Sequence, residues 1–489
     1  MWRIDQKSVT RPPAEGKLCL RERNRPRTPT TPGSPRRGMA QNALLTLLNL
    51  MEVLRPALTT PSFDNMLVVF AGWVLTSGPH AVTQALVETN VAGRRHHEAF
   101  HRFFSRGTWD PDVLGHQIFK RLLGLLGGGP IRVVLDDTLA KKKGSHVFGL
   151  GCHLDAVRST RAVRVFAFGH VWVMLAVLLE VPFSRRSFAL PVLFRLYRNL
   201  KESKAHGDPH KKKTELAREM LDVLATWVDK RHVDVAADSA YCNDTITRGL
   251  PENFNLVGSM RPDAVLTEVP VPRDRQRGRP LKRGTLLPKP ENLAKDEKTP
   301  WQTCTVVLYG GKTSEVKYKT MCGQWYRACG TRLLRIVIVQ CTGGTLPIRV
   351  YFSMDANFTV VQILEGYARR WSIEVAFREL KQLLGFADSS ARKRTAVERT
   401  APFVGFIYSL IVIWFAEGAC TSPLATPPLR PWYSHKNGLC FADALRAAQR
   451  ALAPIDILDP RRDIKDLRKS GPHAHRATKS QRSLRRKAA

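Results

Sequence analysis

Residues 367–381 read Tyr-Ala-Arg-Arg-Trp-Ser-Ile-Glu-Val-Ala-Phe-Arg-Glu-Leu-Lys, and the interpretation of the whole chain starts from them. Their spacing predicts one helix that carries four polar side chains on a single face: Tyr367, Arg370, Glu374 and Lys381. A carboxylate between two cations and a phenol suits a metal-bound phosphate, because the carboxylate can bind the metal while Arg and Lys bind phosphate oxygens. Arg370 and Glu374 are also an ordinary i,i+4 ion pair, so an amphipathic helix without a site is the alternative for this segment alone.

Two upstream segments favour the site. Residues 131–138 and 232–241 are short apolar runs that end in carboxylates, and both are predicted to be buried strands that open at an acidic site. Two strand-end aspartates and a helical glutamate can form one cluster, as needed to hold two divalent cations about 4 Å apart for displacement at phosphorus. In the second strand Asp234 and Asp238 share a face, so both are candidates; the end of the strand favours Asp238.

Together these segments resemble the catalytic core of the DDE transposases of bacterial insertion sequences, in the group marked by Tyr-x2-Arg-x3-Glu-x6-Lys. The Asp-x-Thr pattern of the family matches residues 136–138, and its Asp-x-Gly/Ala-Tyr/Phe pattern matches residues 238–241. Residues 141–144, 148–158 and 169–172 resemble the branch called DDE superfamily endonucleases. The resemblance covers about residues 40 to 415.

The resemblance implies an α/β fold, with a ribonuclease H-like catalytic core interrupted by a β-rich insertion. It implies a DNA transposase that catalyses metal-dependent strand cleavage and transfer at the ends of an insertion sequence. The implied ligands of two Mg²⁺ or Mn²⁺ ions are Asp136, Asp238 and Glu374, and the implied DNA contacts on the signature helix are Tyr367, Arg370 and Lys381. The implied partners are double-stranded element ends and target DNA, bound by a homodimer or higher synaptic assembly in the cytoplasm, at the nucleoid. The alternative is a transposase-derived DNA-binding protein without catalytic activity.

The first aspartate of the cluster has two candidates, Asp136 and Asp137. Neighbouring residues on a strand point to opposite faces, so only one of the two can face the metals. The Asp-x-Thr pattern favours Asp136, whereas relatives with the aspartate directly before Thr favour Asp137. We take Asp136 as the prediction.

Charge independently indicates a nucleic-acid partner. The chain of 489 residues has a formal net charge of +35 and a pI near 10.4, which favours binding to polyanions. Its nine cysteines show no C-x-x-C pair, so we expect free thiols and neither a zinc ribbon nor a disulfide framework. No apolar signal region is visible at the N-terminus.

The predicted organisation combines basic tails with three folded parts. Residues 1–38 are rich in Pro and Arg and are predicted to be a disordered tail, with Met39 as an alternative start. Residues 39–128 are predicted to be a helical DNA-binding domain, residues 129–255 the first part of the catalytic core, and residues 256–345 a β-rich insertion. Residues 346–420 are predicted to be the second part of the core with the signature helix, and residues 421–489 a C-terminal region with a basic tail.

Two basic segments are predicted to contact DNA. Residues 93–106 combine arginines with phenylalanines on a predicted helix, and Arg94 and Arg95 are the candidate contacts there. Lys141, Lys142 and Lys143 follow the first aspartates and would bind flanking phosphates. Solvated basic surfaces are the alternative for both.

Residues 97–101 also match the H-E-x-x-H zinc-peptidase motif, which supports a rival enzyme class. A third ligand is not evident and neighbouring arginines would repel a metal, so this class is disfavoured.

Two apolar runs raise the question of whether the chain could span a membrane. Residues 165–183 are predicted to form a pair of strands, and residues 403–415 are too short to span a bilayer and are predicted to form a core helix, so we expect no membrane partner.

Overall fold

The computed structural model describes residues 35–144, 146–160, 162–271, 281–341, 347–432 and 438–453. The predicted disordered tail therefore lies outside the described residues up to residue 34, and so does the basic C-terminal tail from residue 454 onward. The first helix begins at Pro35, four residues before the predicted domain boundary at residue 39. The described cysteines are all free thiols, as predicted.

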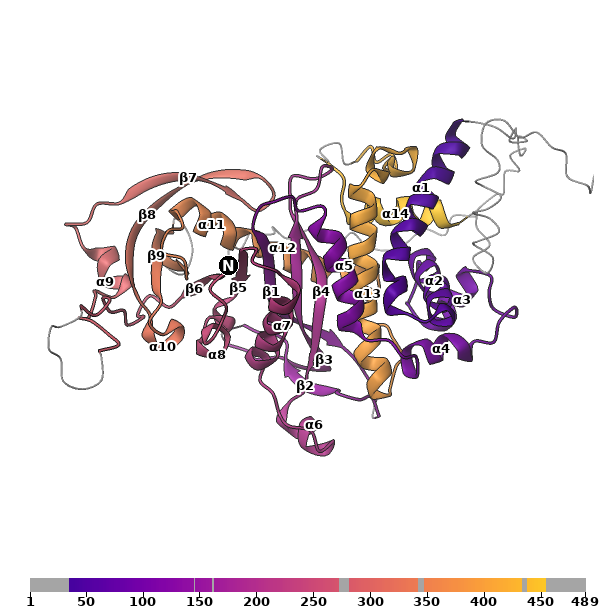
Figure 1. Cartoon of the computed structure of the whole chain (residues 1–489), viewed down its shortest axis with the longest axis horizontal. Helices are drawn as coiled ribbons and strands as arrows, with labels where there is room; N and C mark the ends of the chain where they lie inside the picture. Colours follow the sequence, from indigo (N-terminus) through magenta and orange to yellow (C-terminus); the bar gives the residue numbers. More distant parts are fainter. Residues whose placement is uncertain are drawn as a thin grey trace, which may run out of the picture.

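The predicted helical region contains only helices. They are α1 Pro35–Met51, η1 Glu52–Ala57, α2 Thr60–Leu75, α3 Val82–Glu88, α4 Glu98–Ser105 and α5 Pro111–Leu123. Asp110 caps α5 by accepting a hydrogen bond from the backbone N–H of Asp112 at 2.7 Å, and Pro111 occupies the first helical position. In Figure 1 these helices form the end of the molecule opposite β7 and β8.

One mixed sheet of ten strands forms the centre of the molecule. Its strands are β1 Ile131–Lys141, β2 Gly151–Leu154, β3 Phe166–Leu179, β4 Phe188–Tyr197, β5 Val233–Ala237, β6 Phe254–Met260, β7 Gln302–Leu308, β8 Lys312–Gln324, β9 Leu333–Gln340 and β10 Ile348–Ser353. The strands β4, β3 and β1 are antiparallel neighbours, and β1, β5 and β6 are parallel neighbours. This order is that of a ribonuclease H-like core, which confirms the predicted fold class. The predicted pair of strands over residues 165–183 is wrong, because residues 166–179 form the single strand β3, in which Gly169 pairs with its neighbours and makes no turn.

The strands predicted within the insertion continue the same sheet. β10 pairs antiparallel with β6 and with β9, and β8 joins β9 to β7 at the edge (Figure 1). The predicted boundary between residues 255 and 256 falls inside β6. The remaining helices between the strands are α6 Leu200–Ala205, α7 Lys213–Trp227, η2 Ser239–Tyr241, α8 Asp244–Thr247, α9 Pro290–Lys295 and α10 Tyr326–Cys329.

The C-terminal part contains α11 Val360–Arg369, α12 Trp371–Leu383, α13 Arg394–Ala416, η3 Ala419–Thr421, η4 Pro423–Ala425 and α14 Phe441–Leu452. Among the described helices, α13 alone is long and apolar enough to cross a membrane, and 89% of its apolar window is buried. The prediction that this apolar run is too short to span a bilayer was therefore wrong, since the helix starts at Arg394. The prediction of a core helix is confirmed by its burial. Gly405 lets α13 approach Phe194 of β4 at a point where a Cβ atom would overlap the ring.

Candidate active site

Parallel pairing of β1 with β5 brings the two aspartate motifs together. The register pairs Val134 with Ala236 and Leu135 with Ala237, so Asp136 and Asp238 follow at the same edge of the sheet. Asp238 lies directly after β5, where its carboxylate accepts a hydrogen bond from the Ser239 N–H at 2.7 Å and caps the turn η2. Both predicted strand ends are thus confirmed as neighbours.

The signature segment is two helices rather than the single helix predicted. α11 ends at Arg369 and α12 starts at Trp371, with Arg370 in a turn between them. The backbone of Arg370 remains in the right-handed helical region (φ −52°, ψ −33°). Tyr367 is consequently on α11, while Glu374 and Lys381 are on α12.

Arg370 is the centre of the candidate site. Its Nη1 lies 2.8 Å from Asp136 Oδ2 and 3.5 Å from Glu374 Oε1. The charges of Asp136, Asp238 and Glu374 all raise the pKa of this guanidinium, against the lowering effect of burial, which is the largest influence. Two of the three predicted metal ligands therefore contact one cation, and the charge of the third, Asp238, acts on it as well.

Asp136 is in an environment that opposes its charge. Burial raises the pKa of its carboxyl to about 7, the Arg370 cation acts against that rise, and the Glu374 charge adds to it. Only 15% of its side chain is exposed, compared with 35% for Glu374. A second cation near this group would favour the ionised form.

Asp137 points to the other face of the sheet. Its Oδ1 accepts a hydrogen bond from the Tyr241 hydroxyl at 2.7 Å, and its Oδ2 is 2.6 Å from Lys213 Nζ at the start of α7. Burial and the nearby Asp137 charge raise the pKa of the Tyr241 hydroxyl, so it stays protonated and donates this bond. Both carboxylate oxygens of Asp137 are thus paired with residues away from Arg370.

The other two signature residues contact the protein around the site. Lys381 Nζ donates a hydrogen bond to Thr138 Oγ1 at 2.6 Å, and burial lowers the pKa of this lysine. The Tyr367 hydroxyl is 3.3 Å from Ser259 Oγ, and the Arg370 guanidinium lies 5.7 Å from the centre of the Tyr367 ring. Lys381 thereby fixes α12 to the strand that carries Asp136.

The donor set fits a divalent cation. Within the described ranges, no three His, Cys, Asp or Glu side chains already stand together as a metal site. However, the carboxylates of Asp136 and Glu374 converge on one Arg370 nitrogen, so their oxygens already face a shared positive charge. Carboxylate oxygens are the ligands that Mg²⁺ prefers.

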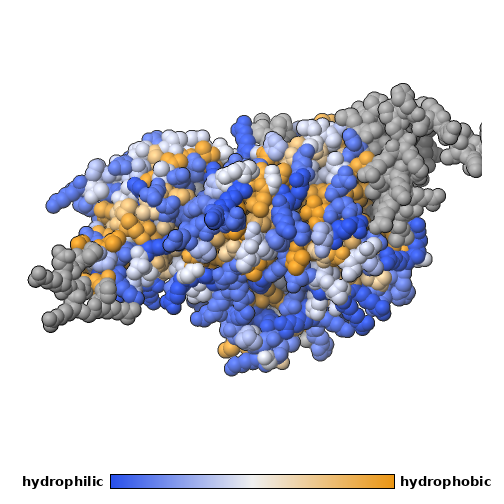
Figure 2. Space-filling view, viewed as in Figure 1, coloured by the Kyte–Doolittle hydropathy of each residue, from blue (hydrophilic) through white to orange (hydrophobic). Residues whose placement is uncertain are grey.

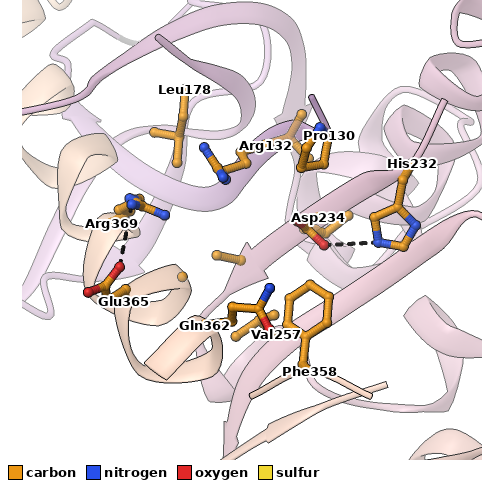
Figure 3. A pocket seen from close by; sticks show the side chains of 14 residues that line it. Pro130, Arg132, Leu178, His232, Asp234, Val257, Phe358, Gln362, Glu365 and Arg369 are labelled. Atoms are coloured by element: carbon orange, nitrogen blue, oxygen red, sulfur yellow. Dashed lines mark hydrogen bonds and ion pairs between the residues drawn. The ribbon is translucent and has the colours of Figure 1, made fainter. Parts of the chain in front are cut away.

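Asp234, the rival of Asp238, faces a pocket of about 250 Å³ near the starts of β1 and β5. In Figure 3 its carboxylate points toward His232, whose Nε2 is 3.1 Å from Asp234 Oδ1, and Glu365 points toward Arg369. Asn255 also donates to the same Asp234 oxygen at 3.2 Å. Both neighbours of Asp234 bind the same carboxylate oxygen three residues before the end of β5, and the geometry favours Asp238.

The predicted phosphate-binding lysines differ in their surroundings. Lys141 Nζ lies 2.6 Å from Asp155, and the Lys142 ammonium donates to the backbone carbonyl of Ser389. Burial lowers the pKa of Lys142, whereas Lys143 is exposed. Lys142 therefore holds the loop after α12, a role that its position in a basic run did not indicate.

The basic helix predicted over residues 93–106 is shorter than expected. α4 starts at Glu98, so Arg94 and Arg95 lie in the preceding turn; Arg94 is exposed, and the Arg95 guanidinium lies 5.6 Å from the centre of the Phe100 ring. The phenylalanines of α4 are buried, as predicted. Gly93 adopts a φ of +85°, which a regular helix does not contain.

The zinc-peptidase motif does not form a metal site among the described residues. Glu98 is paired with Arg102 at 3.0 Å, and the rings of His97 and His101 meet edge to face with centroids 5.8 Å apart. His97 precedes the helix instead of lying on it. The rival enzyme class therefore loses its structural basis.

Sequence reasoning missed two residues at the site. Lys213, at the start of α7, and Ser259, on β6, reach it only through the fold. Neither lies in a motif, and no local pattern pointed to them. Tyr241 was quoted as part of the second motif, but its bond to Asp137 could not be read from the spacing.

Carboxylates at the ends of two parallel strands of a ribonuclease H-like sheet and on the later helix α12 form an arrangement typical of nucleases and polynucleotide transferases. The family model described as DDE superfamily endonuclease matches residues 53–312, more than half of the chain, and the chain belongs to this family. The matched range includes Asp136 and Asp238 but ends before Glu374.

A search of solved structures finds a cryo-EM structure of the piggyBac transposase synaptic complex with hairpin DNA. It is similar with a TM-score of 0.42 and 10% sequence identity, over 90% of this chain and 88% of that chain. No curated protein matches the chain.

Proposed function

We propose that this protein is a DNA transposase that cleaves and transfers DNA strands at the ends of an insertion sequence in a metal-dependent reaction. The observation that carries the proposal is the pairing of Asp136 and Glu374 with Arg370, at the carboxyl end of the strand whose parallel neighbour ends at Asp238. Membership of the DDE superfamily endonucleases supports DNA as the substrate.

Each site residue has a role in this proposal. Asp136, Asp238 and Glu374 would hold two Mg²⁺ ions, or Mn²⁺ in their place. When bound, such ions activate a water or a 3′-hydroxyl and stabilise the leaving oxygen. Since the metal ions supply this activation, the reaction needs no nucleophilic side chain from the protein.

The cations of the signature segment serve the DNA. Arg370 is the largely buried cation that pairs with Asp136 and Glu374, with 11% of its side chain exposed. It would orient a phosphate at the site by charge-assisted hydrogen bonds. Lys381 keeps α12 in register with β1, and Tyr367 would position the strand beside Arg370.

The proposed substrate is double-stranded DNA of the element ends, followed by target DNA. A homodimer or larger synaptic assembly would hold two ends together, in the cytoplasm and on the nucleoid. The net charge of +35 favours such binding at many phosphates.

The test is nicking of a supercoiled plasmid that carries the inverted repeats bracketing the gene. We expect nicks at the repeat boundaries with Mg²⁺ or Mn²⁺ and none with EDTA. A matched plasmid with scrambled repeats is the control. Specific binding to the repeats without any metal-dependent nick would overturn the proposal in favour of a transposase-derived DNA-binding protein.

A further inference from the structure

The hairpin of β2 and β3 presents apolar side chains to solvent. Phe166 and Phe168 are 60% and 61% exposed, and Leu154 is 48% exposed. The register pairs Leu154 with Phe166 and Cys152 with Phe168, so these residues share the outer face of the hairpin. The surface seen in Figure 2 is mostly hydrophilic, with apolar residues in limited patches. An exposed pair of aromatic rings therefore requires a partner.

The surroundings of this face are cationic. Described residues 141–168 contain a single carboxylate, that of Asp155, which is 4% exposed and paired with Lys141 at 2.6 Å. Exposed cations of the same stretch include Lys143, Arg158 and Arg164. Charge complementarity selects a polyanion as the occupant.

The aromatic face continues the face of the sheet that carries Asp136. Antiparallel pairing places Asp136 opposite Met174, Thr138 opposite Trp172 and Ala140 opposite His170. The next pair along this face is Lys142 and Phe168, where the Lys142 N–H donates to the Phe168 carbonyl at 3.1 Å. Alternate residues share a face, so Phe168 and Phe166 project from the same side as Asp136.

The part of this face between Asp136 and the hairpin is buried, since Met174, Trp172 and His170 are 0%, 2% and 3% exposed. The aromatic face of the hairpin is therefore a surface patch of its own, separate from the one at the carboxylates.

We propose that the β2–β3 hairpin is a DNA wedge, in which Phe166 and Phe168 insert at a base step while Arg158 and Arg164 bind the flanking phosphates. Apolar side chains between base steps unstack them and bend the duplex. The choice of element-end DNA as the duplex rests on the proposed transposase function, whereas the DNA contact itself does not.

The test uses the full chain and duplexes of the element end with 2-aminopurine at successive positions. Unstacking raises the fluorescence of this base analogue. We expect the rise to be confined to one base step of the duplex. Phe166→Ala with Phe168→Ala should abolish the rise and weaken binding on the order of tenfold. Leu286→Ala, at a side chain 74% exposed outside the hairpin, is the matched control and should change neither.

A second variant separates the contribution of the arginine charges from that of the phenylalanine rings. Arg158→Gln with Arg164→Gln should keep the fluorescence rise at saturating protein and flatten the slope of log affinity against log salt by about 2. If the double alanine variant retains the rise, or if no position responds, the wedge is wrong even where the wild type cleaves DNA. A localised rise without cleavage would instead refute the proposed function alone.

Other occupants of the face give distinct results. If the two phenylalanine substitutions change the oligomeric state in analytical ultracentrifugation and leave DNA binding unchanged, the face binds a second copy of the chain. If they abolish binding to vesicles with anionic lipids and leave DNA binding unchanged, the face binds a membrane. Either result would overturn the wedge.

Discussion

Asp136 and Asp137 are adjacent on β1 but lie in opposite electrostatic environments. Asp137 has a hydroxyl at 2.7 Å from one oxygen and an ammonium at 2.6 Å from the other. Asp136 Oδ2 has one guanidinium nitrogen at 2.8 Å, which is also 3.5 Å from Glu374, and Asp136 Oδ1 accepts a hydrogen bond from the Asp137 backbone N–H at 2.8 Å. Burial raises the pKa of Asp136 to about 7. The alternation of a strand therefore gives Asp137 an ammonium of its own, whereas Asp136 shares its only nearby cation with Glu374.

This difference separates a structural role from a chemical one. The Asp137 face links β1 to α7 and to the turn η2 that follows Asp238. The Asp136 face gathers acidic groups around a single cation, an arrangement that a bound divalent ion would stabilise. Asp137 is thus a positioning residue for the loop of Asp238, and Asp136 is the proposed ligand.

The largest expected effect on cleavage concerns Glu374, which pairs with Arg370. Glu374→Gln removes a proposed metal ligand and keeps the shape of the side chain, so cleavage of element-end DNA should fall on the order of a thousandfold or more. End binding in a gel-shift assay should stay close to wild type. Glu365→Gln, on the neighbouring helix α11 and lining the pocket at the other end of the strands, is the control. Cleavage by Glu374→Gln at near wild-type rate would remove Glu374 from the site.

The next effect compares the two aspartates directly. Asp136→Asn should abolish cleavage, whereas Asp137→Asn should reduce it about tenfold and lower the free energy of unfolding by about 1–3 kcal/mol, because it breaks a charged hydrogen bond. Nicking assays and urea unfolding measure the two quantities. Loss of cleavage in Asp137→Asn alone would place the metals on the α7 face and reverse the assignment.

A pH-dependent effect tests His170, which is buried on the same face of the sheet as Asp136. Burial lowers the pKa of His170 from 6.5 to about 4, and its Nε2 is 2.9 Å from the carbonyl of Phe148. Its neutral form is favoured in the fold, so stability should fall as the pH drops from 6.5 toward 4. The expected loss from this group between pH 7.5 and pH 5 is about 2 kcal/mol.

Urea unfolding of the wild type and of His170→Asn at pH 7.5 and pH 5 isolates that contribution. The variant should lose less stability than the wild type over this interval, by about 2 kcal/mol. Equal losses in both proteins would show that His170 is charged in the fold and that the face is wetter than its burial implies.

The smallest effect tests the pairing on the Asp137 face. Tyr241→Phe removes the hydroxyl that donates to Asp137 and keeps the buried ring, while Lys213 remains bound to the other oxygen. Unfolding should become easier by about 0.5–1.5 kcal/mol. Cleavage should fall only a fewfold if Lys213 suffices to hold the loop, and a loss as large as that of Asp136→Asn would make Tyr241 part of the chemistry.

The local parts of the site were predictable from sequence. An apolar run that ends in Asp136 predicts a buried strand with an acidic end, and the same holds for the strand before Asp238. The turn at Arg370 was not predictable, because residues 360–381 contain no proline and the spacing fits an unbroken helix. The extension of the sheet by β7 to β10 also depends on long-range pairing, which composition does not encode.

Charge patterns predicted less than apolar patterns did. Lys142 and Lys143 are adjacent lysines of one basic run. Lys142 donates to a backbone carbonyl of the protein, whereas Lys143 is exposed. A basic run indicates that phosphates are a plausible partner, but which cations stay free depends on acceptors brought by distant segments. The proposed wedge at Phe166 and Phe168 could not be predicted from sequence, because a sequence does not distinguish exposed aromatic residues from core residues.

The buried helix α13 has a consequence for the order in which the protein is made. Its segment is apolar enough to resemble a membrane insertion signal when it leaves the ribosome. Its packing partners α4, α5 and β4 all end at least 190 residues before α13 starts, at residue 197 or earlier against residue 394, and can already be folded when it emerges. Among its described helical neighbours, η3 and α14 follow it in the chain. Nascent chains whose N-terminal half has not folded when α13 emerges would therefore expose this helix to the translocation machinery and to aggregation.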